Sequence, residues 1–302
     1  MTLRTMRDED FAAVYDLYTA VEQAAYGWTE TTAEELRTWL TAPTVNIETD
    51  IRLAFEGEEL VGYVDVDRVD GEPPRWWSDV RVRPGGDADA LVDELLAWAT
   101  ERAGEGGIQR VWAPNALDDL RAAYERLGFQ RVRSSYRMEI DLSSELPAGS
   151  IDGVEIRSLG EGEERIAYDL HQQSFQDSWE HIDEPYDDWA HYLVEQESFD
   201  PSLWFIAWDG DRPAGTALCR VRDGVGWIGI LGVLREWRRR GIGRALLAHA
   251  FHEFRRRGLS RAGLGVDAES LTGANRLYES AGMQVVRQLD IFEKQLAPAR
   301  IP

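Results

Sequence analysis

The chain has 302 residues, a hydrophobic content of 43% and a formal net charge of −22. Because so acidic a surface repels nucleic acid and anionic membranes, neither is an expected partner. No apolar run approaches the ~20 residues that span a bilayer, the N-terminus lacks an apolar signal segment, and the single cysteine, Cys219, fits a reducing compartment, so we expect a cytoplasmic protein.

The same order of elements is predicted twice along the chain, at an offset of about 153 residues. Gly62 matches Gly215, and residues 123–129 match residues 277–283. Each copy reads as a strand, helices, a strand hairpin, a strand, a helix, a strand, a helix and a strand. This alternation predicts an α/β fold, with a mixed sheet and helices on both faces. We expect domains at residues 1–142 and 154–302, joined by a polar linker at 143–153 that contains glycine.

The first copy carries acidic residues where a helix follows its central strand. Residues 83–90 read Arg-Pro-Gly-Gly-Asp-Ala-Asp-Ala. Asp87 and Asp89 at a helix start suit capping but repel a bound phosphate. Tyr124, later in this copy, is expected to be a core aromatic residue with a polar tip.

The second copy has a basic, glycine-containing turn at the corresponding place. An apolar strand is predicted at 226–233, a turn at 238–243 that reads Arg-Arg-Arg-Gly-Ile-Gly, and a helix from 244 to 251. Backbone N–H groups at a helix start are unpaired and carry the positive end of the helix dipole, so they suit phosphate. Glycines let the backbone approach the anion, and arginines add charge-assisted contacts.

This turn resembles the (Gln/Arg)-x-x-Gly-x-(Gly/Ala) turn of the GNAT acyltransferase superfamily, which holds the pyrophosphate of acetyl-CoA. A predicted strand at 261–267 and a helix at 272–280 follow, and residues 277–283 resemble the Leu-Tyr-x-x-x-Gly-Phe ending of the superfamily. The match covers roughly residues 154–295. The tandem arrangement resembles that of two-copy members, which pair a weak N-terminal copy with an active C-terminal one.

The resemblance implies roles for residues of the second copy. The pantetheine arm adds to the exposed backbone of strand 226–233 like an extra strand, and an N–H near Leu231 stabilises the developing oxyanion. Tyr278 is the implied general acid that returns a proton to the thiolate. The implied catalytic residues are thus Tyr278 and Leu231, and the implied acetyl-CoA-binding residues are Leu231, Val233, Arg238, Arg239, Arg240, Gly241, Ile242, Gly243 and Arg244.

The sequence leaves the general base open. Many relatives place a glutamate on the cofactor strand, but residues 227–233 contain no acid. Asp177, Glu180 and His181 follow the first helix of the copy, where relatives line the acceptor site, and each reads equally well as part of an exposed acidic loop. Asn275 lies too close to Tyr278 to match the asparagine that relatives use for the pantetheine. No His or Cys spacing suggests a metal site.

Two functions fit these observations. The first is an acetyl-CoA-dependent N-acetyltransferase that acts on a small-molecule amine, with antibiotic, amino-acid or polyamine acceptors all open. The second is a non-catalytic acyl-CoA-binding sensor or scaffold on the same fold, which the undefined base favours and the retained Tyr278 opposes. Neither a metal, nor nucleic acid, nor a membrane is expected to take part, and the oligomeric state is left open.

Overall fold

The computed structural model describes residues 1–69, 71–85, 88–270 and 272–297, so Gly86 and Asp87 of the acidic turn lie outside the described residues. The chain divides into two compact units. Unit 1 contains Met1–Ser134 and the chain from Arg287 onward, and unit 2 contains Ser135–Val286. The predicted domains, residues 1–142 and 154–302, describe the two copies in the sequence and not these compact units. Their bounds stay a prediction.

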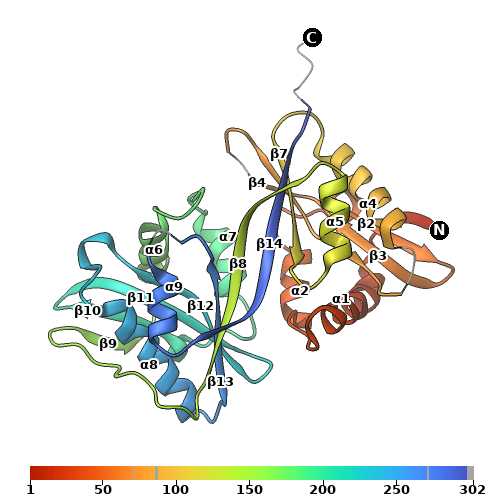
Figure 1. Cartoon of the computed structure of the whole chain (residues 1–302). Coiled ribbons are helices and arrows are strands. Elements are labelled where there is room, and N and C mark those ends of the chain that lie inside the picture. Colours follow the sequence, from red (N-terminus) through yellow and green to blue (C-terminus); the bar gives the residue numbers. More distant parts are fainter. Residues whose placement is uncertain (70, 86–87, 271, 298–302) are drawn as a thin grey trace. The chain divides into compact units, whose positions relative to one another are not determined.

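Unit 1 builds its sheets from strands of the first copy and one strand of the second (Figure 1). The neighbours are β1-β2-β3-β6 in one sheet and β4-β5-β7-β14 in the other. Helix α1 packs with β2 and β3 in one apolar cluster, and α4 packs in a second cluster with Ala54 and Val64 from the same two strands. In chain order the elements are β1 (Thr2–Thr5), α1 (Phe11–Tyr26), α2 (Ala33–Leu40), α3 (Ile47–Asp50), β2 (Ile51–Glu56), β3 (Glu59–Asp65), β4 (Asp67–Val69), β5 (Arg75–Ser78), β6 (Val80–Val82), α4 (Ala88–Ala103), β7 (Ile108–Pro114) and α5 (Asp118–Arg126).

Unit 2 contains one continuous run of paired strands in the order β8-β13-β12-β11-β10-β9. All of these pairs are antiparallel except β12 with β13. The elements are β9 (Glu155–Ser158), α6 (Glu164–Phe175), α7 (Tyr186–Leu193), β10 (Trp204–Asp209), β11 (Arg212–Arg222), β12 (Val225–Val233), α8 (Ile242–Arg256), β13 (Arg261–Asp267) and α9 (Ala274–Ser280).

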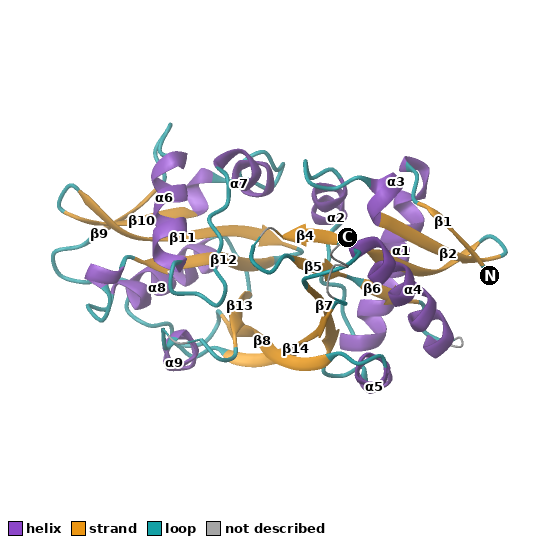
Figure 2. Ribbon diagram, turned by 90° about the horizontal axis from the view of Figure 1, so that it is seen from above, coloured by secondary structure: helices purple, strands orange, loops and turns teal. Residues whose placement is uncertain are grey.

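Helices cover both faces of this sheet. Figure 2 shows α6 and α7 on one face of β10–β12 and α8 on the other. Alternate residues of β10 accordingly belong to two different cores: Phe205 packs with α8, whereas Trp204 packs with α6 and α7. The mixed α/β architecture with helices on both faces, predicted from the order of elements, is thereby confirmed. The single cysteine, Cys219, is buried in the core and is 1% exposed.

Each copy contributes its last strand to the unit of the other copy. Strand β8 (Gln130–Asp141) follows α5 and pairs with β13, with Asp141 opposite Arg261 and Ser135 opposite Asp267. Strand β14 (Gln284–Gln295) follows α9 and pairs with β7, with Gln295 opposite Ile108. The repeat in the sequence did not predict this exchange, because both copies end in the same kind of strand and the pattern does not specify the partner.

Candidate active site in unit 2

A β-bulge at Gly229 interrupts the central strand β12. Leu218 pairs with Ile230 and Cys219 pairs with Ile228, so Gly229 is an extra residue without a partner on β11. The extra residue shifts the side-chain alternation by one position. As a result Ile228 packs in the core under α8, and Ile230 packs in the core under α6 and α7.

Strands β12 and β13 part at the bulge. Their parallel pairing runs from Val225 opposite Arg261 to Ile228 opposite Leu264 and ends there, although β12 continues to Val233. A Cβ built on Gly265, the next residue of β13, would meet no atom within 4 Å. The end of β12 therefore has an edge that β13 does not cover.

The backbone of Leu231 and Val233 faces this edge. Leu234 donates its N–H to the carbonyl of Ala214 on the β11 side at 3.0 Å. Hydrogen-bonding positions alternate along an antiparallel ladder, so Leu231 and Val233 direct their backbone groups away from β11, toward the parting. These are the two strand residues that the sequence resemblance singled out.

The predicted basic turn leads directly into α8. Arg239 has φ +61° and Gly241 has φ +88°, and Gly241 is the N-cap of the helix. Backbone in this left-handed region turns successive N–H groups to one side, which forms a concave anion-binding surface at the positive end of the helix dipole. Ile242 is buried in the core, and a Cβ on Gly243 would lie 3.3 Å from Leu277, so the turn approaches α9 closely at Gly243.

The arginines of the turn have different partners. Arg238 donates to the carbonyl oxygens of Val233 at 3.1 Å and Ser174 at 2.9 Å, and to Asp177 Oδ2 at 2.6 Å. Its side chain therefore fastens the end of β12 to the end of α6 instead of pointing outward. Arg240 lies 3.1 Å from Asp209.

Two further arginines are placed differently. Arg244 is 3.4 Å from Ser280 Oγ at the end of α9. Arg239 is exposed and has no hydrogen bond or ion pair with any residue that the structure describes. The guanidinium of Arg239 is thus available to an anion.

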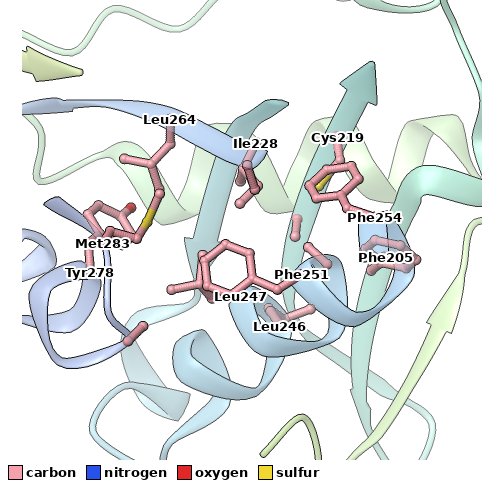
Figure 3. Close-up of a cluster of buried hydrophobic side chains, with 14 of the residues drawn as sticks. Phe205, Cys219, Ile228, Leu246, Leu247, Phe251, Phe254, Leu264, Tyr278 and Met283 are labelled. Carbon is pink, nitrogen blue, oxygen red and sulfur yellow. The ribbon is translucent and has the colours of Figure 1, made fainter. Parts of the chain in front are cut away.

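Tyr278 lies at the boundary between the core and the surface. It is 7% exposed, and Figure 3 shows its ring beside Met283 and Leu264. Burial raises the pKa of its phenol to about 12. No hydrogen bond to the described part of the chain engages this hydroxyl. The group is therefore protonated at neutral pH and can donate a proton.

The residues considered as general bases are already engaged. Asp177 accepts from both Arg235 and Arg238. His181 contacts Asp183 at 3.1 Å. Glu180 lies in the same loop, at φ +50°. This loop thus holds the basic turn in place through Asp177, a role that the sequence did not predict.

His171 of α6 is not suited to act as a base. Its Nδ1 accepts a hydrogen bond from Trp189 Nε1 at 3.0 Å. Burial, with a smaller contribution from the charge of His181, lowers the pKa of His171 to about 4. Asn275, which the sequence analysis set aside, donates to the carbonyl of Ala268 at 2.9 Å and so fixes the start of α9.

The corresponding place in unit 1 is filled by a buried polar network. Asp79 stands between β5 and β6 and is 4% exposed. It accepts hydrogen bonds from Tyr18 at 2.9 Å, from Arg81 Nε at 2.9 Å and from Trp112 Nε1 at 3.0 Å, and its own N–H donates to Asp65. These mutual hydrogen bonds satisfy the buried charges, as burial requires.

Tyr124 of unit 1 is the counterpart of Tyr278. It is fully buried among aromatic rings, 6.0 Å from Phe129 and 5.7 Å from Phe292 between centroids. Its hydroxyl donates to the carbonyl of Trp112 at 3.4 Å, and burial raises its pKa well above the ordinary value of 10.0. The prediction of a core aromatic residue with a polar tip is confirmed.

Within the described ranges no helix is long and apolar enough to cross a membrane. The same part of the chain contains no group of three or more His, Cys, Asp or Glu side chains arranged to hold a metal ion.

Comparison with known proteins places this geometry in a family. The model of the acetyltransferase (GNAT) family matches residues 165–283. A mycothiol acetyltransferase of Thermobispora bispora is 32% identical over 239 residues, which cover 76% of this chain and 78% of the relative. A mycothiol acetyltransferase of Thermobifida fusca is 30% identical over 82% of this chain and 81% of its own length.

Solved structures share the fold over the whole chain. A GCN5-related N-acetyltransferase from Sphaerobacter thermophilus has a TM-score of 0.80 at 28% identity and covers 98% of this chain and 96% of its own. A tandem GNAT protein from the clavulanic acid biosynthesis pathway has a TM-score of 0.76 at 14% identity, with 99% of both chains covered, and shows the fold alone.

The chain belongs to the GNAT acetyltransferase family and has its tandem architecture. It is an N-acetyltransferase homologous to the mycothiol acetyltransferases. This kinship with named enzymes favours catalysis over the sensor alternative.

Proposed function

We propose that the chain transfers the acetyl group of acetyl-CoA to the amine of a small molecule, and that the reaction takes place in unit 2. The observation that carries the proposal is the parting of β12 from β13 after Ile228 and Leu264, directly before the turn that begins α8. An exposed strand edge and an anion-binding helix start, in this order, suit a ligand with an amide-containing arm and a diphosphate.

The residues of unit 2 would divide the work as follows. The backbone of Leu231 and Val233 would pair with the pantetheine arm, and the Leu231 N–H would stabilise negative charge on the carbonyl oxygen. The N–H groups that follow Gly241, together with the Arg239 guanidinium, would hold the diphosphate. When bound, acetyl-CoA supplies the activated acetyl group as a thioester. Tyr278 holds its proton at neutral pH and would donate it to the departing sulfur.

Unit 1 has a different role in this proposal. Its buried Asp79 places negative charge beside the strand where the arm would lie, and Asp89 in the first turn of α4 opposes phosphate. We therefore assign unit 1 to structure. The strand β8, which comes from the first sequence copy, completes the sheet of unit 2.

The relatives' name makes compounds of the mycothiol type the first acceptors to test. Isothermal titration calorimetry of the full chain with acetyl-CoA should give a stoichiometry near one, and an amine panel should release free CoA thiol. Two equivalent sites, or the absence of turnover with every amine, would contradict the proposal.

A further inference from the structure

The side chain of Arg238 joins three segments of backbone beside the proposed acetyl-CoA site. Its Nε donates to the carbonyl of Val233 at 3.1 Å, and one terminal nitrogen donates to the carbonyl of Ser174 at 2.9 Å. The other terminal nitrogen donates to Asp177 at 2.6 Å, and this carboxylate also accepts from the exposed Arg235. Each nitrogen of the Arg238 guanidinium therefore has its own acceptor, and its charge is already compensated.

The contact with Ser174 attaches Arg238 to the last turn of α6. The last carbonyls of a helix have no partner within it and carry the negative end of its dipole, so they favour a guanidinium. A Cβ built on Gly232 would lie 2.9 Å from the Cβ of Ser174, which means that the end of α6 packs directly against β12. Gly232 separates Leu231 from Val233, so the helix ends against the stretch of strand whose edge is exposed.

The contact with Val233 attaches the same side chain to the exposed edge of β12. The Val233 carbonyl points away from β11, and Arg238 Nε is its donor. Arg238 is also the first residue of the basic turn that leads into α8. Its side chain therefore sets the spacing between the edge proposed for the pantetheine arm and the turn proposed for the diphosphate.

We infer that Arg238 and Asp177 are positioning residues, which hold the strand edge and the basic turn at the spacing that aligns the acetyl carbonyl with the Leu231 N–H. The Arg238 guanidinium does not bind the diphosphate. The inference rests on the proposed function. Asp177 acts through Arg238, because it takes one donor of the guanidinium and so directs the other two at the carbonyls of Val233 and Ser174.

The variant Arg238→Lys separates this role from phosphate binding. Lysine keeps the positive charge, which serves a phosphate ligand, but it lacks the planar fork that reaches three acceptors at once. We expect kcat to fall at least about tenfold, because a misplacement of about 1 Å can cost ~10²-fold in rate. The acetyl-CoA dissociation constant, measured by calorimetry, should change by less than about threefold, since the contacts made only in the transition state are the ones lost.

Arg257→Lys is the matched control. Arg257 also divides its guanidinium among three side chains, Asp200, Ser202 and Glu253, and its side chain is 25% exposed, as is that of Arg238. It lies at the C-terminal end of α8, away from the basic turn. Both variants should lose a similar amount of melting temperature, and Arg257→Lys should leave kcat unchanged.

A double variant tests whether Asp177 acts through Arg238. Asp177→Asn alone should lower kcat, and adding Arg238→Lys should cause little further loss, because residues of one contact do not act additively. In an Asp200→Asn background, Arg238→Lys should keep its full effect. Additive losses in the first pair would overturn the role of Asp177.

The wild-type chain shows whether the proposed function itself holds. If it neither binds acetyl-CoA nor acetylates any amine, the proposed function fails and this inference fails with it. If it does both, two results overturn the positioning role alone. One is an acetyl-CoA dissociation constant that rises at least about tenfold in Arg238→Lys while kcat is unchanged, which marks a phosphate ligand. The other is a kcat for Arg238→Lys that matches that of Arg257→Lys.

Discussion

Trp112 and Gly265 occupy the same register position in the two units. Trp112 follows Val111, which pairs with Ser78 where β5 ends, and Gly265 follows Leu264, which pairs with Ile228 where β12 and β13 part. In unit 1 the indole crosses the parting and donates to Asp79 at 3.0 Å. In unit 2 the glycine leaves the same space empty. A tryptophan at this position thus closes the strand edge in unit 1, and a glycine leaves it open in unit 2.

Gly265→Trp should abolish acetyl-CoA binding without unfolding the chain. The indole would fill the parting, and the position has open space and no positive φ, so the strand itself tolerates a side chain. Calorimetry should show at least a tenfold rise in the dissociation constant, with a melting temperature close to that of the wild type. Val221→Trp, an exposed position on β11, is the control. Equal acetyl-CoA affinity in both variants would place the arm elsewhere.

Gly241→Ala should weaken acetyl-CoA binding far more than Gly85→Ala. Both glycines have a positive φ, +88° and +106°, so both substitutions introduce similar backbone strain, roughly 1–2 kcal/mol. In the proposed function the diphosphate binds beside Gly241 and not beside Gly85. A shifted backbone at Gly241 would misplace the N–H groups at the start of α8. The two variants should lose similar melting temperature but differ in acetyl-CoA affinity. Matching affinities would mean that the turn is purely structural.

Tyr278→Phe should lower kcat at least about tenfold and leave acetyl-CoA affinity nearly unchanged, because general acid catalysis contributes ~10²–10⁴ in rate. The ring keeps its packing against Met283, so the fold is preserved. Tyr124→Phe removes a hydroxyl from the core of unit 1 and should reduce stability with no change in kcat. If Tyr124→Phe lowered kcat and Tyr278→Phe did not, the assignment of the chemistry to unit 2 would be wrong.

Asp65→Asn should make the stability of the folded chain less sensitive to rising pH. Burial, followed by the charge of Asp79, raises the pKa of Asp65 from 3.8 to about 7. Between pH 3.8 and about 7 the folded state therefore holds a proton on Asp65 that the unfolded state has lost. The bound proton adds to the free energy of unfolding, and this addition is complete below about pH 4 and is lost as the pH rises through about 7. An amide stays neutral and avoids that loss.

The measurement is the melting temperature of Asp65→Asn minus that of the wild type, which should increase from about pH 5 to about pH 8. Asp141→Asn is the control. Hydrogen bonds from Ser143 lower the pKa of Asp141, so both folded and unfolded forms are ionised in this range and the difference should stay flat. A flat curve for Asp65→Asn would show that the carboxyl is ionised in the folded chain.

The elements of the second copy could be predicted from local pattern. Residues 261–267 were expected as a strand and are one, because alternating small and apolar residues followed by a helix leave few options. The turn before α8 was recognised because Arg-Gly spacing has a direct backbone consequence at Gly241.

Features that depend on distant partners could not be predicted. Arg238 reads as a phosphate ligand until its contacts with Ser174 and Asp177 are known. Arg81 and Asp79 look like the solvent side of a strand, yet both belong to a buried network whose other members come from α1, β3 and β7. A cavity of about 220 Å³ beside the bulge of β12 likewise combines residues from four segments of the chain, and no local pattern marks it.

The exchange of β8 and β14 affects how the protein is made. Ile108 of β7 pairs with Gln295, so the emerging N-terminal half cannot complete its sheet until almost the whole chain has left the ribosome. A fragment cut at the joint would expose β7 as a free edge, the template from which strands aggregate, and the opposite fragment would leave β13 bare. The first copy therefore supplies a strand that the sheet of the second copy needs. We therefore expect neither half to fold when it is expressed alone.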